Sequence, residues 1–397
     1  MLNVGTVLAF SLVLLLASAT AWAGPAANAD IRQVEQYNFS IHILAMLLVG
    51  FGFLMVFVKN YGYSATTGTY LVVATALPLY MLLRSKGILV SESVSPDTIK
   101  ALLLAEFAAA SALIATGAVL GRLKVYQYAI LAALIVPVYA LNEKLVLDGG
   151  LGITRGFTDS AGSIIIHAFG AYFGLGLTIA LTSRLHREIR VESDPTSDRF
   201  AMLGSMVLWI FWPSFCSAMV PPTQMPHTVV NTILALCGAT LTTYVVGSIL
   251  RKGKTSIADM ANAALAGGVA IGATCNLVSA TGAFGIGLLA GVICVMGYVV
   301  IQPKLQNLLK GVDTCGVHNL HGMPGIVGGI AAIFVVPGIA LAQISGIVVT
   351  VVMALAAGLI GGYIIKATGS KTMAYEDAEE FGCEDVDLAL PRQSLLV

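Results

Sequence analysis

Two histidines at related positions give the strongest chemical signal in this sequence. His167 and His318 each follow a segment of the form Asp-x-x-Gly, at residues 159–162 and 313–316, and each enters a long apolar run. An ionisable side chain within such a run is costly to bury and is usually retained for a function. Helix geometry places His167 about 12 Å beyond the first aspartate and His318 about 7.5 Å beyond the second. We therefore expect the two imidazoles to meet in one buried site.

The two aspartates begin the helices that carry these histidines. A carboxylate at a helix start accepts hydrogen bonds from the free N–H groups of the first turn and faces the positive end of the helix dipole. Structural capping is therefore the role that we expect for Asp159 and Asp313. Asp159 is also placed to add negative charge to an entrance.

A third histidine raises the alternative of a metal site. His321 follows His318 by three residues, so the two side chains project from neighbouring parts of one helix face. With His167 they would supply three nitrogen ligands. No HExxH motif and no tightly spaced cysteine pair accompanies them, so we expect neither a metal nor another cofactor. Glu106 and His42 are the other ionisable groups deep in apolar runs, and we expect His42 to pack in the core.

The composition defines the class of protein that must position these groups. Of the 397 residues, 57% are hydrophobic and 11% are charged, against about 25% charged residues in an ordinary soluble domain. Lys and Arg total 21, as do Asp and Glu, so no surplus of positive charge is available for nucleic acid. A soluble enzyme is excluded, and we expect no nucleic-acid partner.

Eleven apolar runs are long enough to cross a hydrocarbon core of about 30 Å. The expected fold is an all-α polytopic membrane protein. A signal peptide is expected over residues 1–23, the membrane domain over 24–371 and an acidic tail over 372–397. The predicted spans are 38–58, 67–84, 100–121, 125–141, 160–183, 200–220, 227–250, 257–279, 283–301, 315–335 and 340–366.

The distribution of charge orients these spans. With the mature N-terminus outside the cell, most Lys and Arg side chains lie on the cytoplasmic side, as the positive-inside rule requires. The acidic tail is then cytoplasmic, either as a solvated end or as a docking site for a regulator. Five spans separate the two Asp-x-x-Gly segments, so the matching helices enter the membrane from opposite faces. This is the pattern of an inverted repeat in a transporter.

Three motifs together resemble the ammonium transporter superfamily, and in particular a bacterial member of its Rhesus (Rh) glycoprotein branch. They lie at 159–174, at 211–215 (Phe-Trp-Pro-Ser-Phe) and at 313–325, and the last is the most specific. The resemblance extends from the first predicted span to the eleventh. It implies a homotrimer in the inner (plasma) membrane, with one pore per subunit. Each subunit would consist of two inverted five-helix repeats plus one extra helix.

The resemblance also implies roles for individual residues. His167 and His318 match twin histidines that line the pore, and His321 matches an additional histidine of the Rh branch. Phe107 and Phe215 match a stacked pair that closes the outer pore mouth as a gate.

Other positions match or depart from the family pattern. Asp159 matches an acidic residue beneath the outer vestibule, and Asp313 is assigned a supporting role. Leu103, Leu147 and Met219 stand where bacterial ammonium transporters have an aromatic residue, a tryptophan and a serine that together hold a cation. The loss agrees with the Rh branch, for which lower affinity and net transport of a neutral gas are expected.

The function expected from these features is ammonium or ammonia transport, not catalysis. Burying an ion costs several kcal/mol even after relaxation, so we expect ammonium to lose a proton near the outer gate and to cross as ammonia. Carbon dioxide is the alternative substrate, because an apolar pore passes it for the same reason. An intramembrane His-metal enzyme and an ammonium sensor that signals through the tail are alternatives from other classes.

Overall fold

The computed structural model describes residues 31–371 and 373–382, and all regular structure in these residues is helical. The predicted signal peptide and residues 383–397 of the predicted tail lie outside them. The chain divides after Glu35, and the architecture below is that of the part from Gln36 onward.

Nine helical segments within the described residues are long and apolar enough to cross a membrane, as expected for a multi-pass membrane protein. They correspond to nine of the eleven predicted spans. In chain order they are Gln33–Phe57, Gly62–Ser85, Ile99–Val119, Val125–Leu147, Ser163–Leu181, Pro195–Ser217, Pro222–Leu250, Ala280–Leu309 and Ala340–Ala367.

The other two predicted spans are interrupted. In place of 257–279 the structure has two short helices, α11 (Ile257–Ala263) and α12 (Ala266–Ile271). In place of 315–335 it has a π-helix, η7 (His318–Gly322), followed by α15 (Met323–Val335). Lipid offers no hydrogen-bond partners to backbone groups, so a helix can be interrupted within the membrane only where protein surrounds it. α12 meets this condition because it is buried along its whole length. The count of eleven spans therefore stays a prediction.

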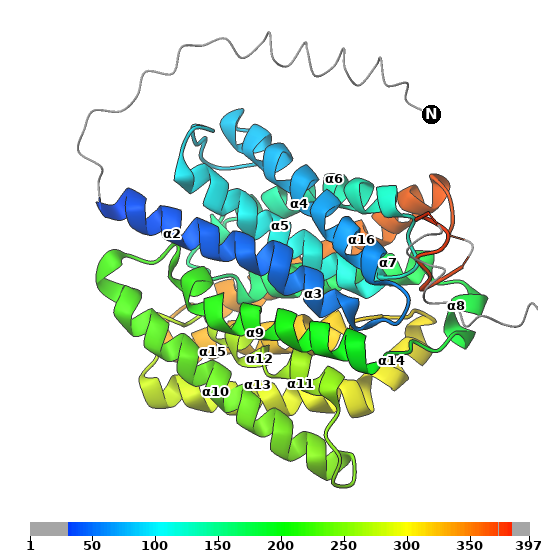
Figure 1. Cartoon of the computed structure of the whole chain (residues 1–397). Helices are drawn as coiled ribbons and strands as arrows, with labels where there is room; N and C mark the ends of the chain where they lie inside the picture. Colours follow the sequence, from blue (N-terminus) through cyan, green and yellow to red (C-terminus); the bar gives the residue numbers. More distant parts are fainter. Residues whose placement is uncertain (1–30, 372, 383–397) are drawn as a thin grey trace, which may run out of the picture. The chain divides into compact units, whose positions relative to one another are not determined.

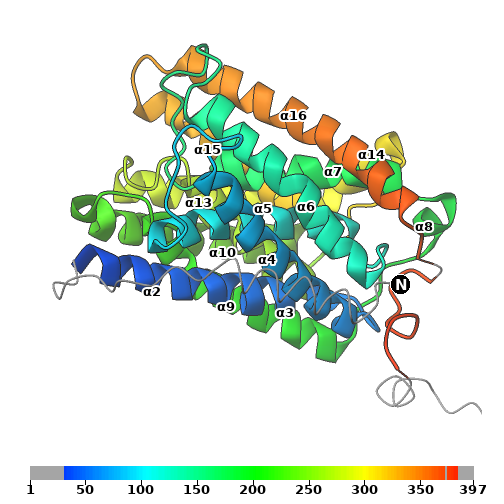
Figure 2. The ribbon, with the colours of Figure 1, turned by 90° about the horizontal axis from the view of Figure 1, so that it is seen from above.

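The helices gather into two groups around the central helix α5 (Ile99–Val119) (Figure 1). In one group α5 packs against α4 (Gly62–Ser85) and α7 (Phe169–Leu181). Figure 2 shows α16 (Ala340–Ala367) running alongside α7 and α6 (Val125–Asn142). The second group contains α9 (Pro195–Ser217), α10 (Met225–Leu250), α12 and α13 (Ala280–Met296).

Close packing within the second group depends on glycine. A Cβ at Gly267 would lie 2.0 Å from the carbonyl oxygen of Ala235, so α12 approaches α10 backbone to backbone. Small residues permit such contact between membrane helices, where lipid supplies no hydrophobic driving force for helix association.

π-helical turns recur at corresponding places along the chain. Two of them, η3 (Glu143–Leu147) and η6 (Gly297–Ile301), follow α-helices of 18 and 17 residues, α6 and α13. Two others, η4 (Ser163–Ala168) and η7, begin the helices that follow the Asp-x-x-Gly segments. Single π-turns are uncommon and are often found at functional sites.

Part of the predicted acidic tail folds onto the helical domain. Asp377 accepts hydrogen bonds from the backbone N–H groups of Tyr63 (2.9 Å) and Ser64 (2.8 Å), at the start of α4. The backbone N–H of Tyr375 donates to the carbonyl oxygen of Gly121 at 2.9 Å. Gly121 has a φ of +83°, and a Cβ there would lie 2.1 Å from the Tyr375 ring. This close approach therefore requires glycine.

Candidate functional site

The two Asp-x-x-Gly segments build the same local structure. Asp159 Oδ2 accepts hydrogen bonds from the backbone N–H groups of Ile164 (2.9 Å) and Ile165 (2.8 Å). The glycine that ends the segment, Gly162, has a left-handed φ of +80°, which favours glycine because it has no Cβ. The carboxylate thereby satisfies free N–H groups at the start of η4.

The second segment repeats this arrangement at the start of η7. Asp313 accepts hydrogen bonds from the backbone N–H groups of Val317 and His318, both at 3.0 Å. Its glycine, Gly316, has a φ of +68°, and a Cβ there would lie 2.3 Å from the Tyr298 ring. In both segments a capped π-turn therefore directs the histidine that follows.

The buried histidine pair consists of His167 and His321. Their Nδ1 atoms lie 3.2 Å apart, and their rings stack with centroids 5.3 Å apart at an interplanar angle of 8°. Both side chains are buried. A hydrogen bond between two Nδ1 atoms requires a proton on one and a lone pair on the other, so the two rings hold opposite tautomers. The ring that accepts is therefore neutral.

The expectation that His167 meets His318 is wrong. The other ring nitrogen of His167, Nε2, has no hydrogen-bond partner, and the His318 ring instead contacts Tyr172 edge-on with centroids 5.7 Å apart. His318 borders a separate small cavity, together with Thr178 and other residues. The reason is the π-turn. Its i→i+5 hydrogen bonding places more residues in each turn, so residues three apart diverge further in direction than they do in an α-helix.

An aromatic pair lies next to the histidine pair. Phe107 of α5 and Phe215 of α9 meet edge to face, with centroids 4.9 Å apart at 70°, and both are buried. The ring of Phe215 lies 5.8 Å from that of His167, and Trp212 stacks on His167 at 5.6 Å. The two phenylalanines and the two histidines therefore form one continuous series of ring contacts.

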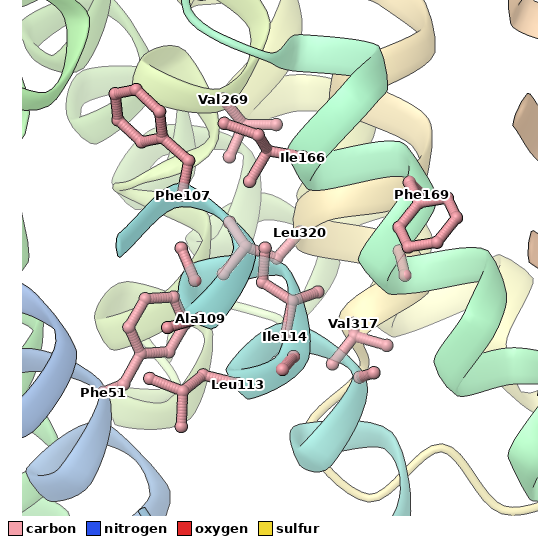
Figure 3. Packing of buried hydrophobic residues seen from close by; sticks show 14 of the residues in the cluster. Phe51, Phe107, Ala109, Leu113, Ile114, Ile166, Phe169, Val269, Val317 and Leu320 are labelled. Atoms are coloured by element: carbon pink, nitrogen blue, oxygen red, sulfur yellow. The ribbon is translucent and has the colours of Figure 1, made fainter. Parts of the chain in front are cut away.

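Beyond the histidine pair the series continues into a narrow apolar cavity. The ring of Phe51 stacks near His321 at 6.3 Å, and the cavity between them has a volume of about 20 Å³. Such a volume accommodates about one small molecule. Figure 3 shows Phe51 and Leu320, which line this cavity, packed among other buried apolar side chains. The cavity is lined by Phe51, Leu54, Met55, Phe57, Leu113, Ile114, Gly117, Asn262, Cys315, Val317, Leu320 and His321.

A wider, more polar cavity of about 280 Å³ follows. It shares Phe57, Asn262 and Cys315 with the narrow cavity, so the two adjoin. Arg251 and Asp259 also line it and form a two-pronged ion pair, with Nε–Oδ2 at 2.6 Å and Nη2–Oδ1 at 2.9 Å. The polarity along the path therefore changes from apolar near His321 to charged at this end.

The sequence holds a signal for the correct histidine. Asp159 precedes His167 by eight residues, and Asp313 precedes His321, not His318, by eight. Equal spacing after equal caps would have selected the right pair. Asn262 and Phe51 have no comparable signal, because each is a single residue whose place on the path depends on contacts with distant segments.

The described residues hold no group of three or more His, Cys, Asp or Glu side chains placed to bind a metal ion. The three-histidine alternative therefore lacks support from geometry, because His318 is directed away from the pair formed by the other two.

Comparison with known proteins shows the family. The model of the Ammonium Transporter Family matches residues 7–389 of this chain. The chain is 40% identical to the rat (Rattus norvegicus) protein "Ammonium transporter Rh type A" over 305 residues, which are 75% of this chain and 66% of the relative. It is 38% identical to the rabbit (Oryctolagus cuniculus) protein "Ammonium transporter Rh type B" over 377 residues, 86% of this chain and 81% of the relative.

A solved structure gives the same answer. The chain is similar to Nitrosomonas europaea Rh50, with 64% sequence identity and a TM-score of 0.88, over 90% of this chain and 96% of that chain. That structure has been described together with a mechanism of conduction by the Rhesus protein family of channels. These relatives are transporters and channels, not enzymes. The resemblance inferred from the three motifs is thus confirmed, and the chain belongs to the Ammonium Transporter Family, within its Rh-type branch.

Proposed function

We propose that this protein carries ammonium or ammonia across the membrane through a pore within each subunit. Ammonium transfers a proton to water on the outer side of Phe107 and Phe215, and ammonia passes the His167–His321 pair into the cavities beyond. The observation that carries this proposal is the unbroken series from the aromatic pair through the histidine pair to the two adjoining cavities. His321 here takes the role that the sequence assigned to His318.

The polarity of the path favours a neutral species. Moving an ion into apolar surroundings costs on the order of several kcal/mol even after relaxation. Ammonia is uncharged and needs only partial replacement of its hydrogen bonds with water. Phe107 and Phe215 close the path on one side, so the ion would have to lose its water there. Ammonium that releases its proton at this point avoids the cost.

The histidine pair suits ammonia in particular. Because the two Nδ1 atoms share one proton, the pair leaves one Nε2 as an acceptor and the other as an N–H donor. Ammonia has one lone pair and three N–H groups, so it can use both. Carbon dioxide has no N–H or O–H group and can use only the donor.

The placement in the membrane follows from charge and symmetry. We place the aromatic pair on the outside and the Arg251–Asp259 cavity in the cytoplasm, which agrees with the positive-inside rule. Paired π-turns at η3 and η6 and at η4 and η7 support two inverted five-helix repeats. Homotrimer assembly, the inner membrane, a cleaved signal peptide and a tail that docks a regulator belong to the same proposal.

The decisive experiment uses purified protein in liposomes. Stopped-flow traces of internal pH are recorded after an inward gradient of ammonia, and separately of carbon dioxide, with membrane current measured under the same gradients. We expect faster alkalinisation by ammonia than in empty liposomes. Faster acidification by carbon dioxide would add the second gas, and a current would show that the proton crosses too. Ammonia traces that match empty liposomes would contradict the proposal.

A further inference from the structure

Glu106 is a buried acid that the proposed route does not use. It immediately precedes Phe107 in α5 and has no exposed surface. The hydroxyl of Ser40, in α2 (Ile31–Ala45), donates to Glu106 Oε1 at 2.5 Å, while Oε2 is buried without a hydrogen-bond partner. An acid buried in a membrane helix is costly and calls for a functional explanation. Its hydrogen bond joins α2 to one of the two helices that carry the aromatic pair.

A second hydrogen bond joins α2 to the other such helix. His42 Nδ1 lies 2.8 Å from the hydroxyl oxygen of Ser214, which immediately precedes Phe215 in α9. The His42 ring also stacks on Phe211, with centroids 4.7 Å apart at 21°. His42 is therefore held against α9 by a polar contact and an aromatic contact together.

The geometry of α2 explains why it reaches both helices. Ser40 and His42 are two residues apart, so they project about 200° apart around the helix axis. One side of α2 therefore meets α5 and the opposite side meets α9. Figure 1 shows α2 passing between α5 and α9, which agrees with the two hydrogen bonds.

We propose that α2 sets the separation of the Phe107 and Phe215 rings through these two hydrogen bonds. The positioning residues are then the four that form these bonds, namely Ser40, Glu106, His42 and Ser214. They determine which molecules the aromatic pair admits. The inference rests on the proposed function, because it takes the aromatic pair as the selective point of the path.

The two hydrogen bonds can affect the gate because they act on residues adjacent to it in sequence. Each bond attaches to the residue directly before a gate ring, so a shift of the attached backbone is transmitted to the ring without an intervening turn. Inside a membrane a polar group has no water to replace a lost partner, so such bonds hold neighbouring helices in register. The rings touch at 4.9 Å, and a small separation of α5 from α9 would widen the passage between them.

The size selectivity of transport tests whether α2 sets the ring separation. A variant that folds poorly would lower the permeability to both substrates and leave their ratio unchanged. We would measure the ratio of methylamine to ammonia permeability in liposomes. Ser40→Ala and Ser214→Ala are each expected to raise this ratio about fivefold, the effect of losing one hydrogen bond worth about 1 kcal/mol. Ser40→Thr keeps the hydroxyl group, so this variant is expected to have the same permeability ratio as the wild type. Ile41→Ala is the matched control, because Ile41 lies between Ser40 and His42 in the sequence and its side chain is 47% exposed.

A role for the charge of Glu106 makes a different prediction. Glu106→Gln keeps an oxygen that accepts from Ser40 but removes the acid, so positioning predicts a ratio like that of the wild type. Glu106→Leu removes the acceptor and is expected to behave like Ser40→Ala. If Glu106→Gln changes the ratio as much as Glu106→Leu does, positioning is overturned in favour of charge.

A structure of the Ser40→Ala/Ser214→Ala double variant measures the separation of the two rings directly, without a transport assay. We expect the ring centroids of Phe107 and Phe215 to lie farther apart than 4.9 Å. An unchanged separation would overturn the inference whether or not wild-type liposomes transport ammonia. Absent ammonia transport with a widened pair would instead count against the proposed function alone.

Discussion

The two helix starts at Asp159 and Asp313 have the same local structure but differ in the number of histidines that follow. Each has a buried aspartate, a left-handed glycine and a π-turn. The first delivers a single histidine, His167. The second delivers His318 and His321, of which only the latter reaches the pair.

The difference teaches that approximate depth in the membrane does not identify the corresponding histidine of a repeat, whereas equal spacing from the capping aspartate does. The distance of each histidine along its helix suggested that His318 was deep enough. Direction around the helix, which the π-turn changes, decides which ring faces the other start. An equal count of eight residues from each aspartate keeps both depth and direction the same in the two halves.

The largest expected effect separates the two histidines of the second start. His321→Ala removes the partner of His167 and leaves one ring without its hydrogen bond, so ammonia-driven alkalinisation in liposomes should slow by about tenfold or more. His318→Ala changes a ring outside the pair and should retain most of the rate. Stopped-flow rates at equal protein content give the comparison. Equal losses in the two variants would contradict the assignment of His321.

An effect of intermediate size distinguishes the two caps. Asp159 accepts both of its N–H groups on one oxygen, whereas Asp313 uses a different oxygen for each. An asparagine has one accepting oxygen, so Asp313→Asn leaves a buried N–H without a partner and should cost about 1–3 kcal/mol. Asp159→Asn should cost less.

The check is the thermal unfolding midpoint of each variant in detergent, compared with the wild type measured in the same preparation. A larger fall for Asp159→Asn than for Asp313→Asn would show that the arrangement of bonds at the two caps does not govern their contributions to stability.

The smallest expected effect comes from a third cap that lies nearer to water. Asp194 accepts from the backbone N–H groups of Thr196 and Ser197 at the start of α9, both at 2.8 Å. The hydrogen bond from Ser197 is the main cause that lowers the pKa of this carboxyl below its ordinary value. A lowered pKa means that the charged form stabilises the fold above the ordinary carboxyl range and that this contribution is lost as pH falls through the lowered pKa.

Asp194→Asn keeps an accepting oxygen and removes the charge. It should therefore cost a few tenths of a kcal/mol to about 1 kcal/mol near neutral pH. The difference from the wild type should shrink as the pH falls below about 4, the ordinary pKa range of an aspartate, and should vanish only below the lowered pKa of Asp194. Unfolding midpoints recorded from pH 7 down to pH 3 give the comparison. A difference that grows in acid would contradict the sign of this effect.

Much of the site was predictable because it is local in sequence. The membrane class follows from composition, and the two aspartates lie within six residues of the N–H groups that they bond. The family resemblance implies that Phe107 and Phe215 form a stacked pair, and the structure places the two rings in contact, edge to face. The broken spans at 257–279 and 315–335 were not predicted, because burial among neighbouring helices permits interruptions that an apolar pattern does not reveal.

The sequence by itself determined that this is a membrane transporter of the Rh type, with capped histidine-bearing helices in two halves of the chain. The tertiary structure decided that His167 meets His321, 154 residues away, and that the His318 ring contacts Tyr172 instead. The spacing of eight residues after each aspartate indicates this pair, but hydropathy and depth along the helix do not. The physical reason is that hydropathy and spacing fix a residue's depth in the membrane. The direction in which its side chain points depends on the local turn and on the helices packed against it.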